Sequence, residues 1–221
     1  MVGVISDIHS NLAALQAVLA EIDKLGCKKI ICLGDIAGYY SSINECIDLL
    51  KEHEVYCLMG NHDYYLATGS SCGSRTVNLV IEYQKQIIND VNLNWIRNLP
   101  VTYDTGYVSC RHAGWNQPLE ERFYQFDFNQ VAGMGQRLYF SGHSHIQYIQ
   151  KESGKIYCNP GAVGQPRDLD PRAGFAVYDE SGQISIYRVE YDIDDTVWRM
   201  KKANLGEWIW EPLYRGAQIG K

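Results

Sequence analysis

Features that would assign the chain to a special class are absent from its sequence. No apolar run approaches the roughly 18 residues that a membrane-spanning helix needs, and the opening residues MVGVISDIH contain no basic leader region. The seven cysteines are odd in number and never form a C-x-x-C pair, which argues against a disulfide framework and a thiolate metal site. These absences predict a cytoplasmic protein with reduced thiols that neither spans nor crosses a membrane.

Basic residues are in short supply as well. The chain has 20 Lys and Arg against 26 Asp and Glu, which gives a net charge of −6. Proteins that hold nucleic acid by neutralising its phosphates carry a basic surface, so neither strong nucleic-acid binding nor a nuclease is expected. A small phosphorylated ligand remains compatible with this charge, because bound cations can offset the local repulsion.

The first third of the chain alternates between two kinds of element. Apolar runs at 2–6, 28–33 and 54–59 have the length and composition of buried strands, and amphipathic helical patterns at 11–25 and 43–52 separate them. This order is typical of β-α units, in which parallel strands are joined by crossover helices. A further helical pattern covers 76–98 and ends before Pro100.

The second half of the chain is rich in short alternating segments. They lie at 106–111, 137–141, 146–150, 155–158, 174–178 and 184–190. Their spacing predicts a second sheet built largely from hairpins. Since no Pro-rich or Gly/Ser-rich linker interrupts the chain, we expect one domain over 1–221. Its expected fold class is α/β, a four-layer α/β/β/α sandwich of two mixed sheets flanked by helices.

An aromatic-rich tail follows at about 192–221. It contains Trp198, Trp208 and Trp210 among aliphatic residues. Two interpretations are open: the tail packs on its own domain, which is the more common use of aromatic residues, or it forms a partner surface. A homodimer through these aromatics is one hypothesis of the second kind.

Polar side chains gather where the predicted strands end. The strand ends carry Asp7 and His9, Asp35, Asn61 and His62, His112, and His143 and His145. Ligands of open α/β sheets bind at the carboxyl ends of the strands, so these side chains are expected in one crevice. A donor set of oxygen and nitrogen without sulfur suits Mn, Fe, Co, Ni or Zn. Two such ions about 3.5–4 Å apart, bridged by one carboxylate, could promote displacement at phosphorus.

The ordered motifs D-x-H, G-D-x-x-G, G-N-H-D, a lone strand-end His and G-H-x-H span residues 7–145. This set resembles the calcineurin-like metallophosphoesterase superfamily. The stretch NPGAVGQPRD at 159–168 is similar to the N-P-G-S-V-G-x-P-R stretch of its small bacterial and archaeal phosphodiesterase-like members. The resemblance implies a dinuclear-metal-dependent phosphoesterase that cleaves diester or monoester bonds of a small, nucleotide-like substrate through a metal-bridging hydroxide. G-N-H-D in place of G-N-H-E, and the lack of D-R-G, argue against a protein phosphatase.

The resemblance also implies residue roles. One metal would be held by Asp7, His9, Asp35 and His145, and the other by Asp35, Asn61, His112 and His143. Mn or Fe would be the foremost candidates, with Ni, Co, Zn or Mg as alternatives. His62 would donate a proton to the leaving group or bind a phosphate oxygen, and a His of near-neutral pKa beside Asp63 would fit that role. Asp35, Asn61 and His62 are thus the candidate catalytic residues.

Each candidate substrate-binding residue has two possible interpretations. Tyr39 and Tyr40 either line the pocket and stack on a base, or pack within their loop. Arg167 either binds a second phosphate or pairs with Asp168 or Asp170. For the whole chain, the alternative is a metal-binding but non-catalytic scaffold of the same fold, which the complete set of ligand residues disfavours.

Overall fold

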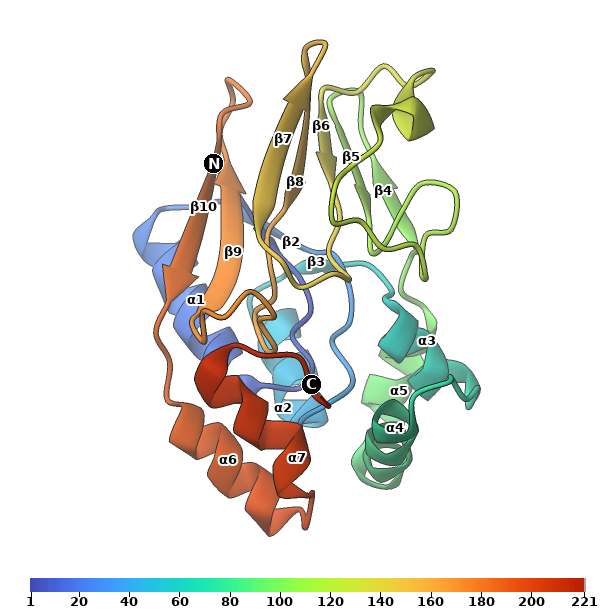
Figure 1. The fold of residues 1–221 in the computed structure, drawn as a ribbon, viewed down its shortest axis with the longest axis vertical. Coiled ribbons are helices and arrows are strands. Elements are labelled where there is room, and N and C mark those ends of the chain that lie inside the picture. The colour runs from blue at the N-terminus through green and yellow to red at the C-terminus, as the bar shows by residue number, and fades with distance from the viewer. Residues whose placement is uncertain (221) are drawn as a thin grey trace.

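Two five-stranded sheets form the frame of the molecule in the computed structural model, which describes residues 1–220 (Figure 1). The first sheet has the order β10-β9-β1-β2-β3, with β1 (Val2–Ile5), β2 (Lys29–Cys32), β3 (Tyr56–Cys57), β9 (Ala173–Tyr178) and β10 (Ile184–Val189). The second has the order β4-β5-β6-β8-β7, with β4 (Thr102–Asp104), β5 (Val108–Arg111), β6 (Leu138–Phe140), β7 (Tyr148–Glu152) and β8 (Lys155–Asn159). Both are mixed, with three parallel strands each.

Helices cover the outer face of the first sheet. They are α1 (Leu12–Lys24), α2 (Ile43–Glu52), α3 (Asn61–Thr68), α4 (Arg75–Ile87), α5 (Asp90–Arg97), α6 (Ile193–Lys202) and α7 (Glu207–Trp210), followed by the 3-10 helix η2 (Glu211–Arg215). The other 3-10 helix, η1 (Phe128–Val131), packs on the second sheet. Helix α1 begins where the Asn11 side chain accepts a hydrogen bond from the Ala14 N–H, and it buries one apolar face. None of the helices in the described part of the chain combines the length and apolar character needed to cross a membrane.

Strand alternation builds a separate core between the sheets. Val4 and Ile31 point toward the second sheet, whereas their neighbours Ile5 and Cys32 point toward the helices. The outer face of the second sheet is covered by the segment 113–136, which contains η1. Its Phe126 stacks on Tyr157 of β8 with ring centroids 4.1 Å apart. The segment is therefore anchored by aromatic packing.

The predicted two-sheet α/β sandwich is confirmed, and three details of the prediction are wrong. β9 and β10 join the first sheet, with β9 antiparallel to β1. β5, β6 and β8 are parallel, so the second sheet contains crossovers where hairpins were expected. The helix predicted over 76–98 is two helices, because Ile88 adopts an extended backbone and Asn89 caps α5. Strand β4 and helix α3 were not predicted.

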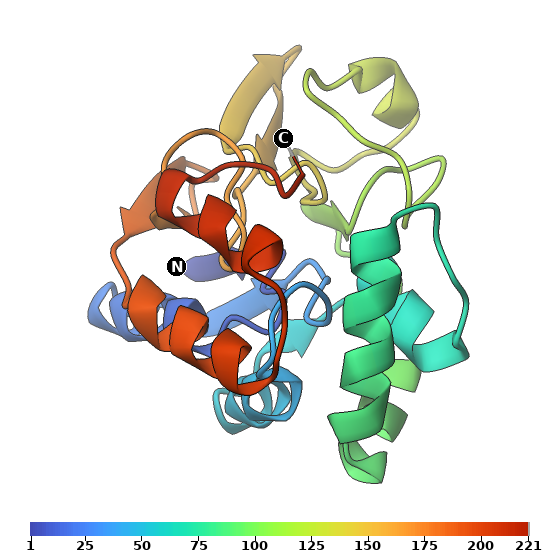
Figure 2. The same cartoon turned by 60° about the horizontal axis from the view of Figure 1, so that its bottom comes forward.

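The C-terminal tail packs on its own domain, which was the first of the two interpretations. Met200, Ile209, Trp210 and Leu213 are buried in the core beneath the helices. Helix α6 lies beside α1 (Figure 2). Trp198 and Trp208 remain 51% and 54% exposed.

Within residues 1–220, the seven cysteines form no disulfide.

Candidate metal centre

The strand ends bring the predicted site residues to one edge of both sheets. Asp7 and His9 follow β1, Asp35 follows β2 and Asn61 opens α3 just after β3. From the second sheet come the residues after β5 and β6, which are His112, His143 and His145. All seven are buried. The expected convergence on a single crevice is thus observed, and the two sheets supply the site jointly.

The backbone of the site is strained. Five of these residues have positive φ angles, namely Asp7 at 55°, His9 at 50°, Asp35 at 55°, His143 at 62° and His145 at 62°. Side-chain-bearing residues in this left-handed region cost about 1–3 kcal/mol each, so the surrounding structure must hold them there. Backbone hydrogen bonds do so: the Asp7 N–H donates to Gly34 O at 3.0 Å and the His9 N–H to Asp35 O at 2.9 Å. Such strain is concentrated at functional sites.

Two glycines of the motifs allow the loops to approach closely. A Cβ at Gly60 would lie 2.2 Å from both the backbone nitrogen and Oδ1 of Asp35. A Cβ at Gly142 would lie 2.0 Å from Ser6 Oγ and 2.5 Å from Asp7 Oδ2. These glycines therefore set the positions of the two carboxylates, which explains their place in the motifs.

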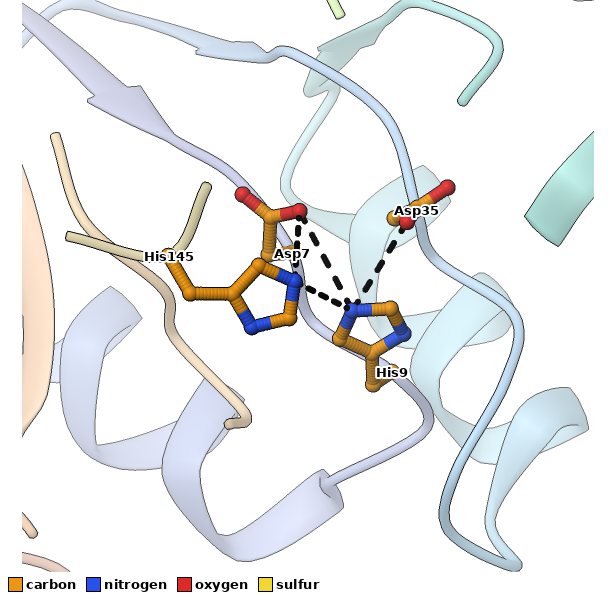
Figure 3. A group of neighbouring side chains, drawn as sticks. All are labelled: Asp7, His9, Asp35 and His145. Carbon is orange, nitrogen blue, oxygen red and sulfur yellow. Dashed lines mark hydrogen bonds and ion pairs between the residues drawn. The ribbon is translucent and has the colours of Figure 1, made fainter. Parts of the chain in front are cut away.

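Asp7, His9, Asp35 and His145 form the inner group (Figure 3). Their ligand atoms all lie within 4.8 Å of one another. The His145 Nε2 is 3.3 Å from Asp7 Oδ1 and 3.2 Å from His9 Nε2, and the His9 Nε2 is 3.7 Å from Asp35 Oδ2. All four side chains are buried.

The tautomers of the inner histidines leave room for a cation. The Nδ1–H of His9 donates to Ala37 O at 2.9 Å, and that of His145 to Gln165 O at 2.6 Å. Because a carbonyl only accepts, both protons of the neutral rings are used there, and both Nε2 atoms direct lone pairs at each other and at Asp7. Lone pairs converging without a proton between them fit a positive ion.

Asp35 also belongs to the outer group, with His112, His143 and the amide of Asn61. The His112 Nε2 lies 3.5 Å from Asp35 Oδ2, 3.1 Å from Asn61 Oδ1 and 3.2 Å from His143 Nδ1. Its own Nδ1–H donates to Leu33 O at 3.2 Å, so Nε2 again presents a lone pair. The two groups share Asp35 and lie side by side.

Burial controls the charge state of both groups. It raises the pKa of Asp7 to about 7, and burial together with the charge of Asp7 raises the pKa of Asp35 well above its usual range. Burial lowers the pKa of His112 to about 3 and that of His9 well below its usual value. The imidazoles are thus neutral, which is the form that coordinates metals, and the carboxylates lack a positive partner.

His62 lies at the site but in neither group. Its Nε2 is 3.9 Å from Asp35 Oδ2, and its Nδ1 is buried without a hydrogen-bond partner within residues 1–220. Burial, followed by the charge of Arg167, lowers its pKa well below the usual value. This direction differs from the near-neutral pKa expected for His62. The Asp63 carboxylate accepts from the Ala37 and Gly60 N–H groups at 2.8 and 2.9 Å.

A cavity of about 550 Å³ opens over the outer group. Among its lining residues are Tyr39, Asn61, His62, Tyr65, Glu120, Arg122, His143, Arg167, Gln218 and Ile219. Tyr40 does not line it, contrary to one interpretation, because its side chain is fully buried in the core beneath the helices.

Arg167 reaches the cavity and forms neither of the predicted ion pairs. It donates to the Tyr39 hydroxyl at 2.9 Å and to Gln165 Oε1 at 2.6 Å. Asp168 is paired with Arg188, and Asp170 with Arg172, so both carboxylates are already used. The guanidinium of Arg167 is left to face the cavity with neutral partners.

Several residues that line the cavity could not be predicted from the sequence. Arg122 lies in a loop without a motif, Glu120 accepts the Tyr65 hydroxyl at 2.5 Å, and Gln218 and Ile219 come from the far end of the chain. The only local signal was Gln165 within the NPGAVGQPRD stretch, since its side chain donates to Ala217 O at 2.8 Å and draws that end of the chain to the cavity.

A sandwich of two mixed sheets with adjoining buried histidine and aspartate groups at one edge is the arrangement of a metallophosphoesterase. The model of the calcineurin-like phosphoesterase superfamily domain matches residues 1–183, and the chain belongs to this superfamily. It is 38% identical over 239 residues to an uncharacterized protein of Methanocaldococcus jannaschii, with 98% of each chain covered.

Two solved structures are similar over nearly the whole chain. A metallophosphoesterase from Sphaerobacter thermophilus shares 29% identity at a TM-score of 0.87, with 98% of each chain covered. A hypothetical protein from Pyrococcus horikoshii shares 20% identity at a TM-score of 0.88, covering 99% of this chain and 100% of that one. The similarity extends past residue 183 and includes the C-terminal helices.

Proposed function

We propose that this protein hydrolyses a small phosphorylated substrate with two metal ions, one in the inner group and one in the outer group. The observation that carries the proposal is that the two groups share Asp35 and that the outer one opens on the cavity. The charge balance supports it, since two buried carboxylates with neutral imidazoles fit cations. Membership of the phosphoesterase superfamily supports the reaction type.

The donor set fits transition metals with nitrogen and oxygen ligands. Asp7, His9 and His145 would hold the inner ion, Asn61, His112 and His143 the outer ion, and Asp35 both. Mn or Fe are our foremost candidates, with Ni, Co, Zn or Mg as alternatives. When bound, such ions supply an activated water and neutralise charge on phosphate oxygens.

Residues of the cavity would orient the substrate. His62 is next to Asp35 and outside both groups, so it can hydrogen-bond a phosphate oxygen or the leaving-group oxygen. Arg167 offers its guanidinium fork to a phosphate, and Tyr39 positions Arg167 through its hydroxyl. The Tyr39 ring packs against both His9 and His62, with centroids 4.5 and 4.9 Å away. We propose that its position keeps water out of this side of the site.

The test is Mn-supplemented hydrolysis of p-nitrophenyl phosphate and bis-p-nitrophenyl phosphate side by side. Asp35→Asn is expected to lower either activity by at least about 100-fold, because both ions lose a ligand. His62→Ala is expected to lower activity with two ions still bound. His53→Ala is the matched control, since His53 lies outside the site at the end of α2 and near Asp23.

The two substrates separate the reaction classes. A preference for the diester assigns a phosphodiesterase, and a preference for the monoester assigns a phosphatase of small metabolites. Two ions bound per chain without turnover of any phosphate ester tested would contradict the proposal and favour a non-catalytic scaffold.

A further inference from the structure

Arg122 lies at the mouth of the cavity on the side of the outer group. Its Nη2 is 3.3 Å from His143 Nε2. The next residue, Phe123, is buried with Phe126 against Tyr157 of the second sheet, so the chain on one side of Arg122 is anchored by aromatic packing. Arg122 itself is exposed, and its side chain is free to take another direction.

No carboxylate neutralises this guanidinium. Glu120 accepts the Tyr65 hydroxyl at 2.5 Å, and Glu121 accepts Gln130 Nε2 at 2.8 Å. Across residues 1–220, Arg122 takes part in no ion pair within 4.0 Å. The Arg122 guanidinium lies beside a cavity, and both neighbouring carboxylates have other partners. It is therefore suited to bind an anionic ligand.

The contact with His143 places this guanidinium beside the outer group. Arg122 Nη2 lies 3.3 Å from His143 Nε2, and His143 Nδ1 lies 3.2 Å from His112 Nε2. A guanidinium in this position can donate to an anion that binds in the cavity beside these histidines.

We propose that Arg122 is a phosphate-binding residue that turns its guanidinium from His143 toward an anionic substrate in the cavity. The inference rests on the proposed function and adds a substrate contact to it. Arg122 and Arg167 then offer two guanidinium groups to one substrate, Arg122 beside His143 and Arg167 beside Tyr39. The substrate class that this favours is a phosphate ester with at least two negative charges, such as a monoester dianion.

The experiment uses isothermal titration calorimetry with two probes. Inorganic phosphate is titrated into the Mn-loaded protein, and Mn is titrated into the metal-free protein. Arg122→Gln is expected to weaken phosphate binding by about 10- to 100-fold, as removal of charge-assisted hydrogen bonds does. It should leave Mn binding unchanged or make the weaker site tighter, because a nearby positive charge is lost.

Two further variants serve as controls. Arg137→Gln removes an exposed arginine that contacts Ser181 O and lies outside the site, and it should leave both affinities unchanged. Arg122→Lys keeps the charge without the planar fork and should bind phosphate with intermediate affinity. Thermal unfolding of each variant confirms that it is folded.

The opposite directions of the two effects distinguish the proposal from a merely structural role. Equal phosphate affinity in the wild type and Arg122→Gln overturns it, and so does weaker Mn binding by Arg122→Gln, which would make Arg122 a support for His143. If the wild type hydrolyses esters while Arg122→Gln binds phosphate equally well, only this inference fails. If the Mn-loaded wild type binds no phosphate and cleaves no ester, the proposed function fails and this inference falls with it.

Discussion

The inner and outer groups differ in how firmly the protein holds their ligands. Both inner histidines are fixed through Nδ1 by backbone carbonyls, and neither they nor Asp7 line the cavity. Of the outer histidines, only His112 is fixed by a carbonyl, while His143 lines the cavity and contacts the exposed Arg122. If both groups bind metal as proposed, we expect the inner ion to be held permanently and the outer ion, which would face the cavity, to be exchangeable.

The largest effect is expected from displacing Asp35, the residue that both groups share. Gly60→Ala would place a Cβ 2.2 Å from the Asp35 backbone nitrogen and Oδ1. We expect activity to fall at least about 100-fold, both ions to be lost, and stability to fall by about 1–3 kcal/mol. Metal analysis, hydrolysis and thermal unfolding would measure this. Gly106→Ala, whose Cβ would meet nothing within 4 Å, is the control. Normal metal content in Gly60→Ala would contradict the account of Asp35.

Removing one histidine from each group tests the comparison directly. His143→Ala should leave about one ion per chain after dialysis, because the inner ligands remain intact. His145→Ala removes an inner ligand with a fixed tautomer and should lower the affinity for the first ion by about 100-fold or more. Metal content by mass spectrometry after graded dialysis distinguishes them. If His143→Ala loses both ions and His145→Ala keeps one, the assignment of permanent and exchangeable sites is reversed.

A smaller effect is expected from the residue that supports the loop between His143 and His145. The buried Asn159 amide donates to Gly142 O at 2.7 Å and to Ser144 Oγ at 2.9 Å. Asn159→Ala should weaken metal binding by about 10-fold through misplacement of the loop. Asn129→Ala, at an exposed position in η1, is the matched change. The same Mn affinity in both variants would show that the loop holds its conformation without this amide.

The sequence was a good guide to the ligands and a poor guide to their surroundings. Asp7, Asp35 and Asn61 follow buried strands, and carboxyl ends of parallel strands converge, so their meeting could be predicted. The sheet to which β9 belongs could not, because an alternating strand has the same pattern in either sheet. Arg122 reaches the cavity through aromatic packing of its loop on Tyr157, a contact that no local pattern encodes.

The return of the chain to the cavity matters for anyone who handles the protein. Leu169 N–H donates to Gly216 O at 3.0 Å, and Gln218 and Ile219 form part of the cavity wall. An affinity tag or fusion partner attached behind residue 220 would therefore begin next to this cavity. Val2 begins the strand whose opposite end leads to Asp7, and it lies at a separate cavity. Purification handles and immobilisation linkers therefore belong ahead of Val2, where they leave the cavity beside the outer group open.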